Sequence, residues 1–82
     1  MADQPKFYVN NNPSKDGQHD VYDENGELVC GTENSPEQAT INIEIATGLK
    51  ENDFTVTFED MCTFDDGKTF PAWFDRPNPD DE

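Results

Sequence analysis

The sequence predicts a small α+β domain, with one helix packed on one face of a small antiparallel sheet, in the order β-β-β-α-β-β. Three observations predict this class. Segments in which apolar and polar residues alternate lie on both sides of a central segment. Clusters of Gly, Pro, Asn and Asp separate these segments at short intervals. The central segment opens with a helix-capping pattern.

The first 31 residues read as a three-stranded meander. We expect the first strand at residues 6–10, with Tyr8 on the opposite face from its neighbours. Residues 11–17 form a turn, and the alternating residues 18–23 pair back on the first strand. The Asn25-Gly26 pair then predicts a type I′ hairpin turn, whose two central residues need positive φ, before a third strand at 28–30.

The central segment carries two competing patterns. Residues 40–45 alternate perfectly between polar and apolar, which is typical of a strand. Ser35, Pro36 and Gln38 instead form the start of a helix, as N-cap, first helical residue and capping-box partner. The cap decides for a helix over 36–47 that stops at Gly48. On that helix Ile41, Ile45 and Leu49 share one face, and Ile43 is partly exposed on its flank.

The last part of the chain begins with a clear strand at 54–58, which places Phe54, Val56 and Phe58 inward. Residues 61–64 either continue this strand past a bulge or begin a new one. A second tight turn follows at 65–68, and the apolar segment 71–74 is expected to lie on the sheet and close the core.

Length and composition indicate a single domain at 6–75, between a disordered N-terminus at 1–5 and a flexible acidic tail at 76–82. Only 32% of the residues are hydrophobic, but the six Phe, two Tyr and one Trp argue against disorder. We therefore expect a thin core rich in aromatics. The N-terminus lacks the pattern of a signal peptide and no apolar run could span a membrane, so a cytoplasmic protein is expected.

The charge is the strongest functional signal. The chain has 19 Asp and Glu against 5 Lys and Arg, a formal net charge of −14. Solubility of a small domain needs a net charge of only about 2–8. Duplex DNA of similar length, roughly 30 Å, carries about 18 phosphates. A folded surface with this charge repels nucleic acid and anionic membranes, and attracts basic grooves. Solubility or salt adaptation remains the alternative explanation.

No residue pattern indicates catalysis, a metal or a cofactor. His19 has carboxylates nearby, but a surface histidine beside acidic residues is the simpler interpretation. Paired carboxylates are so frequent that pairs arise by chance, and neither Gly26 nor Gly67 fits a calcium loop. Cys30 and Cys62 are expected to be free thiols, or a disulfide if they face each other on adjacent strands. We expect a protein that is not an enzyme.

In size, charge and helix-plus-sheet pattern the chain resembles small acidic phage-encoded inhibitors, such as anti-CRISPR proteins and inhibitors of uracil-DNA glycosylase. The resemblance is one of type and involves no motif. It implies a DNA-mimic inhibitor that binds a basic, nucleic-acid-binding host protein, such as a CRISPR effector complex, within the host cytoplasm. The candidate binding residues are Asp20, Asp23, Glu24, Glu27, Glu33, Glu37, Glu44, Glu59, Asp60, Asp65 and Asp66.

A second hypothesis places the binding energy elsewhere. Tyr and Trp dominate many protein interfaces, because each combines a large apolar ring with a polar handle. Tyr8, Tyr22 and Trp73 are the candidates for such an aromatic patch, although Trp73 also suits a lid on the core. On this hypothesis the protein is a non-catalytic interaction module, and its charge serves solubility.

Overall fold

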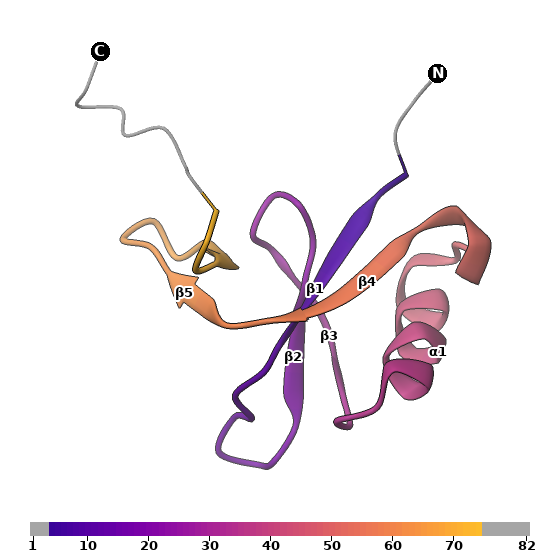
Figure 1. Ribbon diagram of the computed structural model, residues 1–82, viewed down its shortest axis with the longest axis horizontal. Coiled ribbons are helices and arrows are strands. Elements are labelled where there is room, and N and C mark those ends of the chain that lie inside the picture. Colours follow the sequence, from indigo (N-terminus) through magenta and orange to yellow (C-terminus); the bar gives the residue numbers. More distant parts are fainter. Residues whose placement is uncertain (1–3, 75–82) are drawn as a thin grey trace.

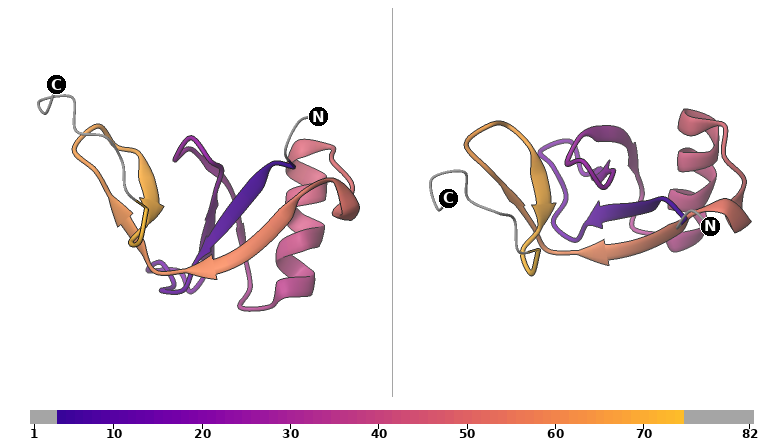
Figure 2. Two further views of the ribbon diagram at one scale, coloured as in Figure 1. Left: turned by 45° about the horizontal axis from the view of Figure 1, so that its top comes forward. Right: turned by 90° about the horizontal axis from the view of Figure 1, so that it is seen from above.

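A four-stranded sheet forms the middle of three layers in the computed structural model, which describes residues 4–74. One helix covers one face of this sheet, and a two-stranded hairpin lies on the other (Figures 1 and 2). The predicted α+β class with a single helix is confirmed. Of the predicted terminal segments, the tail at 76–82 lies outside the described residues. Within 1–5, Gln4 and Pro5 are described, and they bond to Asn52 and Thr55.

The sheet contains three neighbouring strands from the first part of the chain and one from the last part. Its strand order is β3-β2-β1-β4. The β1–β2 and β2–β3 pairs are antiparallel, as expected for a meander. The bounds are β1 Lys6–Asn10, β2 His19–Tyr22, β3 Leu28–Thr32 and β4 Thr55–Glu59.

The pairing of β4 with β1 is parallel, so the expectation of a wholly antiparallel sheet was wrong at this pair. The register runs from Lys6 opposite Thr55 to Asn10 opposite Glu59. The reason is the helix between β3 and β4. It returns the chain to the end of the sheet where β3 began, so β4 runs in the same direction as β3 and β1.

The helix α1 (Pro36–Thr47) has the predicted bounds and caps. The Ser35 side chain accepts a hydrogen bond from the Gln38 N–H, and Pro36 occupies the first turn. Gly48 ends the helix with a φ of 79°, and its N–H donates to the Glu44 carbonyl. The capping pattern therefore outweighed the strand-like alternation of 40–45.

The buried face of α1 differs from the predicted one. Ile43 is fully buried together with Ala39, whereas Ile41 and Ile45 are 46% and 78% exposed. Alternating isoleucines point about 200° apart on a helix, so Ile41, Ile43 and Ile45 cannot all face the sheet. The Asn42 side chain fixes the rotation, because its amide donates to the Gly31 carbonyl of β3 at 3.0 Å.

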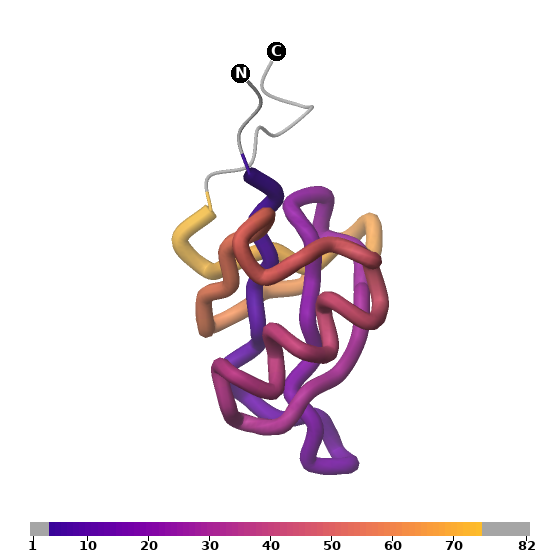
Figure 3. Tube along the Cα trace, turned by 90° about the vertical axis from the view of Figure 1, so that its right-hand side faces the viewer, coloured from indigo at the N-terminus to yellow at the C-terminus, as the bar shows by residue number. Residues whose placement is uncertain are grey.

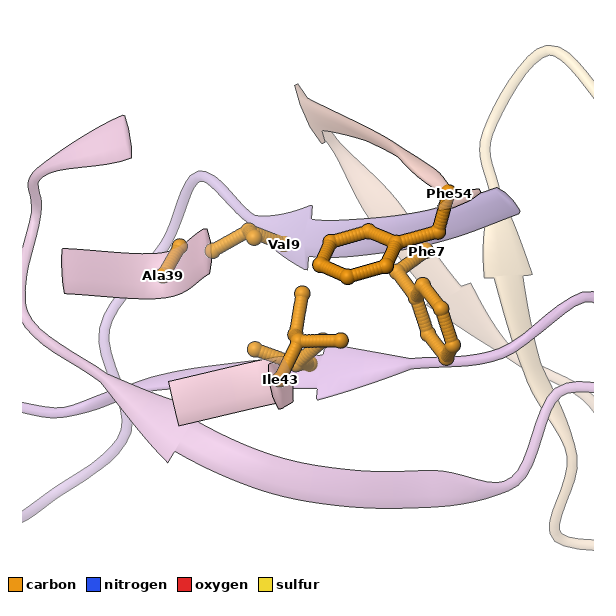
Figure 4. Close-up of a cluster of buried hydrophobic side chains, with 6 residues drawn as sticks. Phe7, Val9, Ala39, Ile43 and Phe54 are labelled. Carbon is orange, nitrogen blue, oxygen red and sulfur yellow. The ribbon is translucent and has the colours of Figure 1, made fainter. Parts of the chain in front are cut away.

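The core between α1 and the sheet is small, as expected. It consists of Phe7, Val9, Val21, Ala39, Ile43 and Phe54, and Figure 4 shows Ile43 reaching from the helix toward the two phenylalanines. The rings of Phe7 and Phe54 pack edge to face, with their centroids 5.4 Å apart. Val56 and Phe58 are half-buried beside this core, so the predicted inward face of β4 is confirmed.

The hairpin layer forms where the chain leaves the sheet at Asp60. Residues 61–64 begin a new strand, which settles the alternative left open above. The hairpin consists of β5 (Met61–Thr63) and β6 (Thr69–Pro71), and a 3-10 turn at Glu51–Asp53 precedes β4. A second aromatic cluster lies in this layer, with Phe70 between Phe64 and Phe74. The segment 71–74 thus lies over the face of the sheet opposite α1.

Candidate functional site

The predicted acidic residues fall into three groups in space. One group sits on two neighbouring hairpin turns, and we call it the turn cluster: Asp23, Glu24, Glu27, Asp65 and Asp66. A second group lies on and before α1, at Glu33, Glu37 and Glu44. The third group, Asp20, Glu59 and Asp60, belongs to β2 and the end of β4. The structure therefore brings five of the eleven candidates together on one feature.

Both turns of this cluster have the same backbone design. Within residues 23–27 and 64–68 the chain forms a four-residue turn whose last residue is a glycine with positive φ, at Gly26 (79°) and Gly67 (85°). No other residue type in the described chain has positive φ, so Asn25 does not, and the predicted type I′ turn was wrong. The hairpin itself is where we expected it. A turn followed by a left-handed glycine forms a three-residue loop, which needs only one such residue.

Hydrogen bonds from backbone N–H groups hold two of these carboxylates, those of Asp23 and Asp66, in place. Asp23 Oδ1 accepts hydrogen bonds from the N–H groups of Asn25 (2.8 Å) and Glu27 (3.0 Å). Asp66 Oδ1 accepts one from the Lys68 N–H at 3.0 Å. An aspartate bonded to its own turn keeps its charge at a fixed point, at little further cost in side-chain entropy.

The two turns are joined by contacts between segments about 40 residues apart in sequence. The Thr69 N–H donates to the Gly26 carbonyl at 3.0 Å. Lys68 forms an ion pair with Glu27. A shallow depression of about 460 Å³ lies between the turns, lined by residues that include Tyr22, Thr63 and Asp66.

Lys68 is the cation within the turn cluster. Its hydrogen bond to Glu27 raises its pKa, and the nearby charges of Glu27, Asp66 and Asp23 raise that pKa further. The lysine therefore stays protonated, and it offsets one of five negative charges. Lys68 is not among the binding residues predicted from the sequence, although its place directly after Asp65-Asp66-Gly67 was the available signal.

The glutamates on the helix surround an exposed isoleucine. Glu37, Glu44 and Glu51 line a second shallow depression of about 480 Å³ together with Ile41. The Glu44 carboxylate accepts a hydrogen bond from the Glu51 N–H at 2.9 Å, which ties the helix to the turn before β4. Glu33 precedes the helix and is exposed. These residues form a separate acidic surface, around α1.

The three aromatic candidates lie on the hairpin side of the sheet but differ in exposure. Tyr8 is 9% exposed, Tyr22 is half-buried, and Trp73 is 61% exposed. Trp73 meets Tyr8 edge to face at 6.0 Å, and its indole N–H donates to Glu59 at 2.8 Å. Burial is the main cause that raises the pKa of both tyrosines. An aromatic contact surface would therefore consist mainly of Trp73.

The remaining candidates for chemistry have structural surroundings. His19 is only 6% exposed, so the expectation of a surface histidine was wrong, and its Nδ1 lies 2.7 Å from the Asn10 carbonyl. Cys30 and Cys62 are free thiols, as the first alternative predicted, and burial raises the pKa of Cys30. Within residues 4–74, no group of three or more His, Cys, Asp or Glu side chains is placed to hold a metal ion.

The fold and the site define a small α+β protein with acidic surfaces. Comparison of the chain with known protein families, with curated proteins and with solved structures found no match. Across the part of the chain that the structure describes, no helix is long and apolar enough to cross a membrane.

Proposed function

We propose that this protein is an acidic, DNA-mimic-type inhibitor that binds the basic nucleic-acid groove of a host protein. The turn cluster is the observation that carries the proposal, because it holds five carboxylates against one ammonium group on two joined turns. A CRISPR effector complex is one partner with such a groove. The inhibitor would then act in the cytoplasm of the host cell.

Rigid turns suit this role for an energetic reason. A flexible acidic tail loses conformational entropy when a groove orders it, whereas carboxylates already fixed on a folded frame lose little. Asp23 and Asp66 are each bonded to backbone N–H groups of their own turns. Binding energy from these charges would therefore be retained as affinity.

The test uses two variants with the same net charge. The first neutralises the turn cluster with Glu24→Gln, Asp65→Asn and Asp66→Asn. The second neutralises the helix surface with Glu33→Gln, Glu37→Gln and Glu51→Gln. Each tagged variant and the unmodified protein are incubated with host lysate at low salt, and the captured proteins are then challenged with duplex DNA. We expect the unmodified protein and the helix-surface variant to capture nucleic-acid-binding proteins that DNA displaces, and the turn-cluster variant to lose them.

The matched variants separate a specific surface from bulk charge. Equal losses in both variants would show that only the net charge attracts the partner. Captured proteins that DNA does not displace, or capture that is unaffected by salt, would contradict the proposal as well. A groove built for phosphates must release the mimic when phosphates or salt compete.

The second candidate is an interaction module that binds through its aromatic residues. The exposed Trp73 ring favours it, since exposed tryptophans are common binding anchors. Trp73→Ala would then abolish capture while the turn-cluster variant kept it. The DNA-mimic proposal predicts the reverse pattern, so the same capture experiment decides between the two.

A further inference from the structure

The β4 strand is an outer strand of the sheet with an unusual composition for an edge. Its only strand neighbour among residues 4–74 is β1, and Figures 2 and 3 show it along the margin of the sheet. Residues 54–58, Phe-Thr-Val-Thr-Phe, contain no charge in a chain in which 29% of residues are charged. Exposed edges are usually protected by charges, prolines or a covering element. The opposite edge has such protection, because Asn42 of α1 bonds to Gly31 of β3.

The backbone groups on the outer side of β4 can be assigned from the register. The Thr55 N–H donates to the Pro5 carbonyl, and the Glu59 carbonyl accepts from the Asn11 N–H. Hydrogen-bonding direction alternates along a strand, so Thr55, Thr57 and Glu59 bond to β1. The N–H and C=O groups of Val56 and Phe58 therefore point outward, where no described strand lies. This edge offers two donors and two acceptors in the spacing of a sheet.

A cleft lies beside this edge, on the hairpin side of the sheet. It has a volume of about 250 Å³ and is lined by Lys6, Tyr8, Thr55, Thr57, Glu59 and Trp73. Trp73 and Glu59 are hydrogen-bonded to each other and form one end. Lys6 pairs with Thr55, four residues and about 13 Å along the strand from Glu59. A guanidinium group entering at the Glu59 end could pair with the carboxylate and stack on the indole ring, away from Lys6.

The two faces of β4 set the side chains that a neighbouring strand should carry. A residue opposite Thr57 would point into the cleft, where a basic side chain fits. Residues opposite Val56 and Phe58 would point to the helix side, where both of these side chains are half-buried beside the apolar core. The complementary pattern is apolar–basic–apolar.

We propose that β4 binds an extended segment of a basic partner protein by strand addition, with an arginine opposite Thr57 and apolar residues opposite Val56 and Phe58. Main-chain bonds would supply affinity, and the cleft would supply specificity. A second copy of this chain is a poor occupant. Glu51 and Asp53 precede β4, and Glu59 and Asp60 end it, so self-pairing in either direction brings carboxylates together. The β4 edge is separate from the turn cluster, which lies on the turns between β2 and β3 and between β5 and β6.

The probe is a capped synthetic pentapeptide, Lys-Val-Arg-Val-Lys, titrated against the full chain and followed by the fluorescence of the single tryptophan. Two derivatives have identical charge and composition. One carries backbone N-methyl groups on both valines, and the other carries one on the arginine and one on the second lysine. In a paired strand only alternate N–H groups face β4, so one derivative should bind at least about tenfold more weakly than the other. Hydrogen exchange should slow at the Val56 and Phe58 amides when the unmodified peptide binds.

Protein variants test the cleft. Glu59→Gln, which keeps an acceptor for the indole, and Trp73→Ala should each weaken binding of the peptide by about fivefold or more. They should have little effect on a peptide with norleucine in place of arginine. Titration calorimetry measures these affinities, because Trp73→Ala removes the only tryptophan. Glu33→Gln is the matched control, because it removes the same charge from an exposed residue beside β3, at the opposite edge of the sheet, and it should change affinity less than about twofold.

Several results would overturn the proposal. Equal binding of the two N-methylated derivatives, or equal effects of Glu33→Gln and Glu59→Gln, would show nonspecific attraction to an acidic protein. No binding at about 1 mM peptide, an affinity too weak to matter at this edge, would overturn it too. Concentration-dependent dimerisation that protects the Val56 and Phe58 amides without peptide would assign the edge to a second copy instead. None of these outcomes depends on whether the turn cluster binds a nucleic-acid-binding protein.

Discussion

Gly26 joins the two halves of the turn cluster through the absence of a side chain. Its φ of 79° lies in the left-handed region, and a Cβ there would lie 2.9 Å from both Lys68 Cβ and a carbon of the Phe70 ring. Phe70 is itself buried, and its ring lies next to this glycine. The close approach of the hairpin to the sheet at this point therefore requires glycine.

We expect Gly26→Ala to destabilise the protein more than the same change at the equivalent turn positions. Gly17→Ala and Gly67→Ala are the controls, because they have φ values of 83° and 85° but nothing within 4 Å of the new Cβ. Those two substitutions should lower the free energy of unfolding only by the cost of placing alanine in the left-handed region, about 1–2 kcal/mol each. Gly26→Ala adds the clash, and its excess destabilisation is measured by urea unfolding. Equal effects at all three positions would show that the second hairpin shifts to accommodate the new Cβ without loss of stability.

The isoleucines of α1 give a second prediction. Ile43→Ala should lower the free energy of unfolding by about 2–5 kcal/mol, because Ile43 is fully buried between the helix and the sheet. Ile45→Ala should change it by less than about 0.5 kcal/mol, because Ile45 is 78% exposed and alanine is a good helix former. Denaturant titration of both variants checks the rotation of the helix. A larger effect at Ile45 would restore the face predicted from the sequence.

At the scale of elements, local signals in the sequence were sufficient to locate the helix and strand β4. Ser35, Pro36 and Gly48 mark the helix ends, and the alternation of 54–58 marks β4. The rotation of α1 was not predictable, because apolar residues lie on several sides of it and a polar bond from Asn42 decides among them. The parallel β1–β4 pair was missed because hairpin signals describe only neighbouring segments.

The cap at Ser35 can be tested as an element. Ser35→Ala removes the acceptor for the Gln38 N–H and should cost about 1 kcal/mol. Ser35→Asp should restore the lost stability, since aspartate caps helices well and its charge suits the helix N-terminus. Thermal melts followed by circular dichroism at 222 nm compare the three proteins. An unchanged melting temperature for Ser35→Ala would show that packing alone positions this helix end.

The candidate site was predictable only in part. The sequence shows that acidic residues are numerous, and its glycine-containing turns place several of them at hairpin ends. Which turns meet depends on long-range contacts, such as Thr69 with Gly26, that no local pattern encodes. The exposure of β4 likewise depends on strand order, which sequence reasoning did not determine.

For the whole molecule, the net charge of −14 predicts a response to salt. Repulsion between like charges is stronger in the folded state than in the expanded chain, and salt screens it. The melting temperature should therefore rise between about 0.02 M and 0.5 M NaCl, where the Debye length falls from about 20 Å to about 4 Å. Sucrose at equal osmolarity is the control for preferential exclusion. A melting temperature that fell with salt would show that ion pairs such as Glu27–Lys68 dominate.

Stability should also decline in alkaline solution. Burial raises the pKa values of Tyr8 and Tyr22 above the usual 10.0, and the bond to Glu27 raises that of Lys68. The folded state therefore binds more protons than the unfolded state above about pH 10, and its stability falls as pH rises through these pKa values. Between pH 7 and 9 these groups should contribute no change. Urea unfolding of Tyr8→Phe and Tyr22→Phe should show a shallower decline, and an unchanged slope would contradict this cause.

Side chains of β1 point alternately to the two faces of the sheet, so the sheet separates two packed regions, one under the helix and one under the hairpin. Phe7 and Val9 belong to the helix core, whereas Tyr8, between them, faces the hairpin and Trp73. The fluorescence of the single tryptophan therefore reports on the hairpin side, and the circular dichroism of the helix reports on the helix core. Because the hairpin aromatics pack on the opposite face of the sheet from Ile43, we expect the hairpin to open without exposing the helix core to water. Melting curves from fluorescence and from circular dichroism that do not coincide would then reveal this local opening. A two-state fit of either curve would give the unfolding free energy of one side of the sheet only.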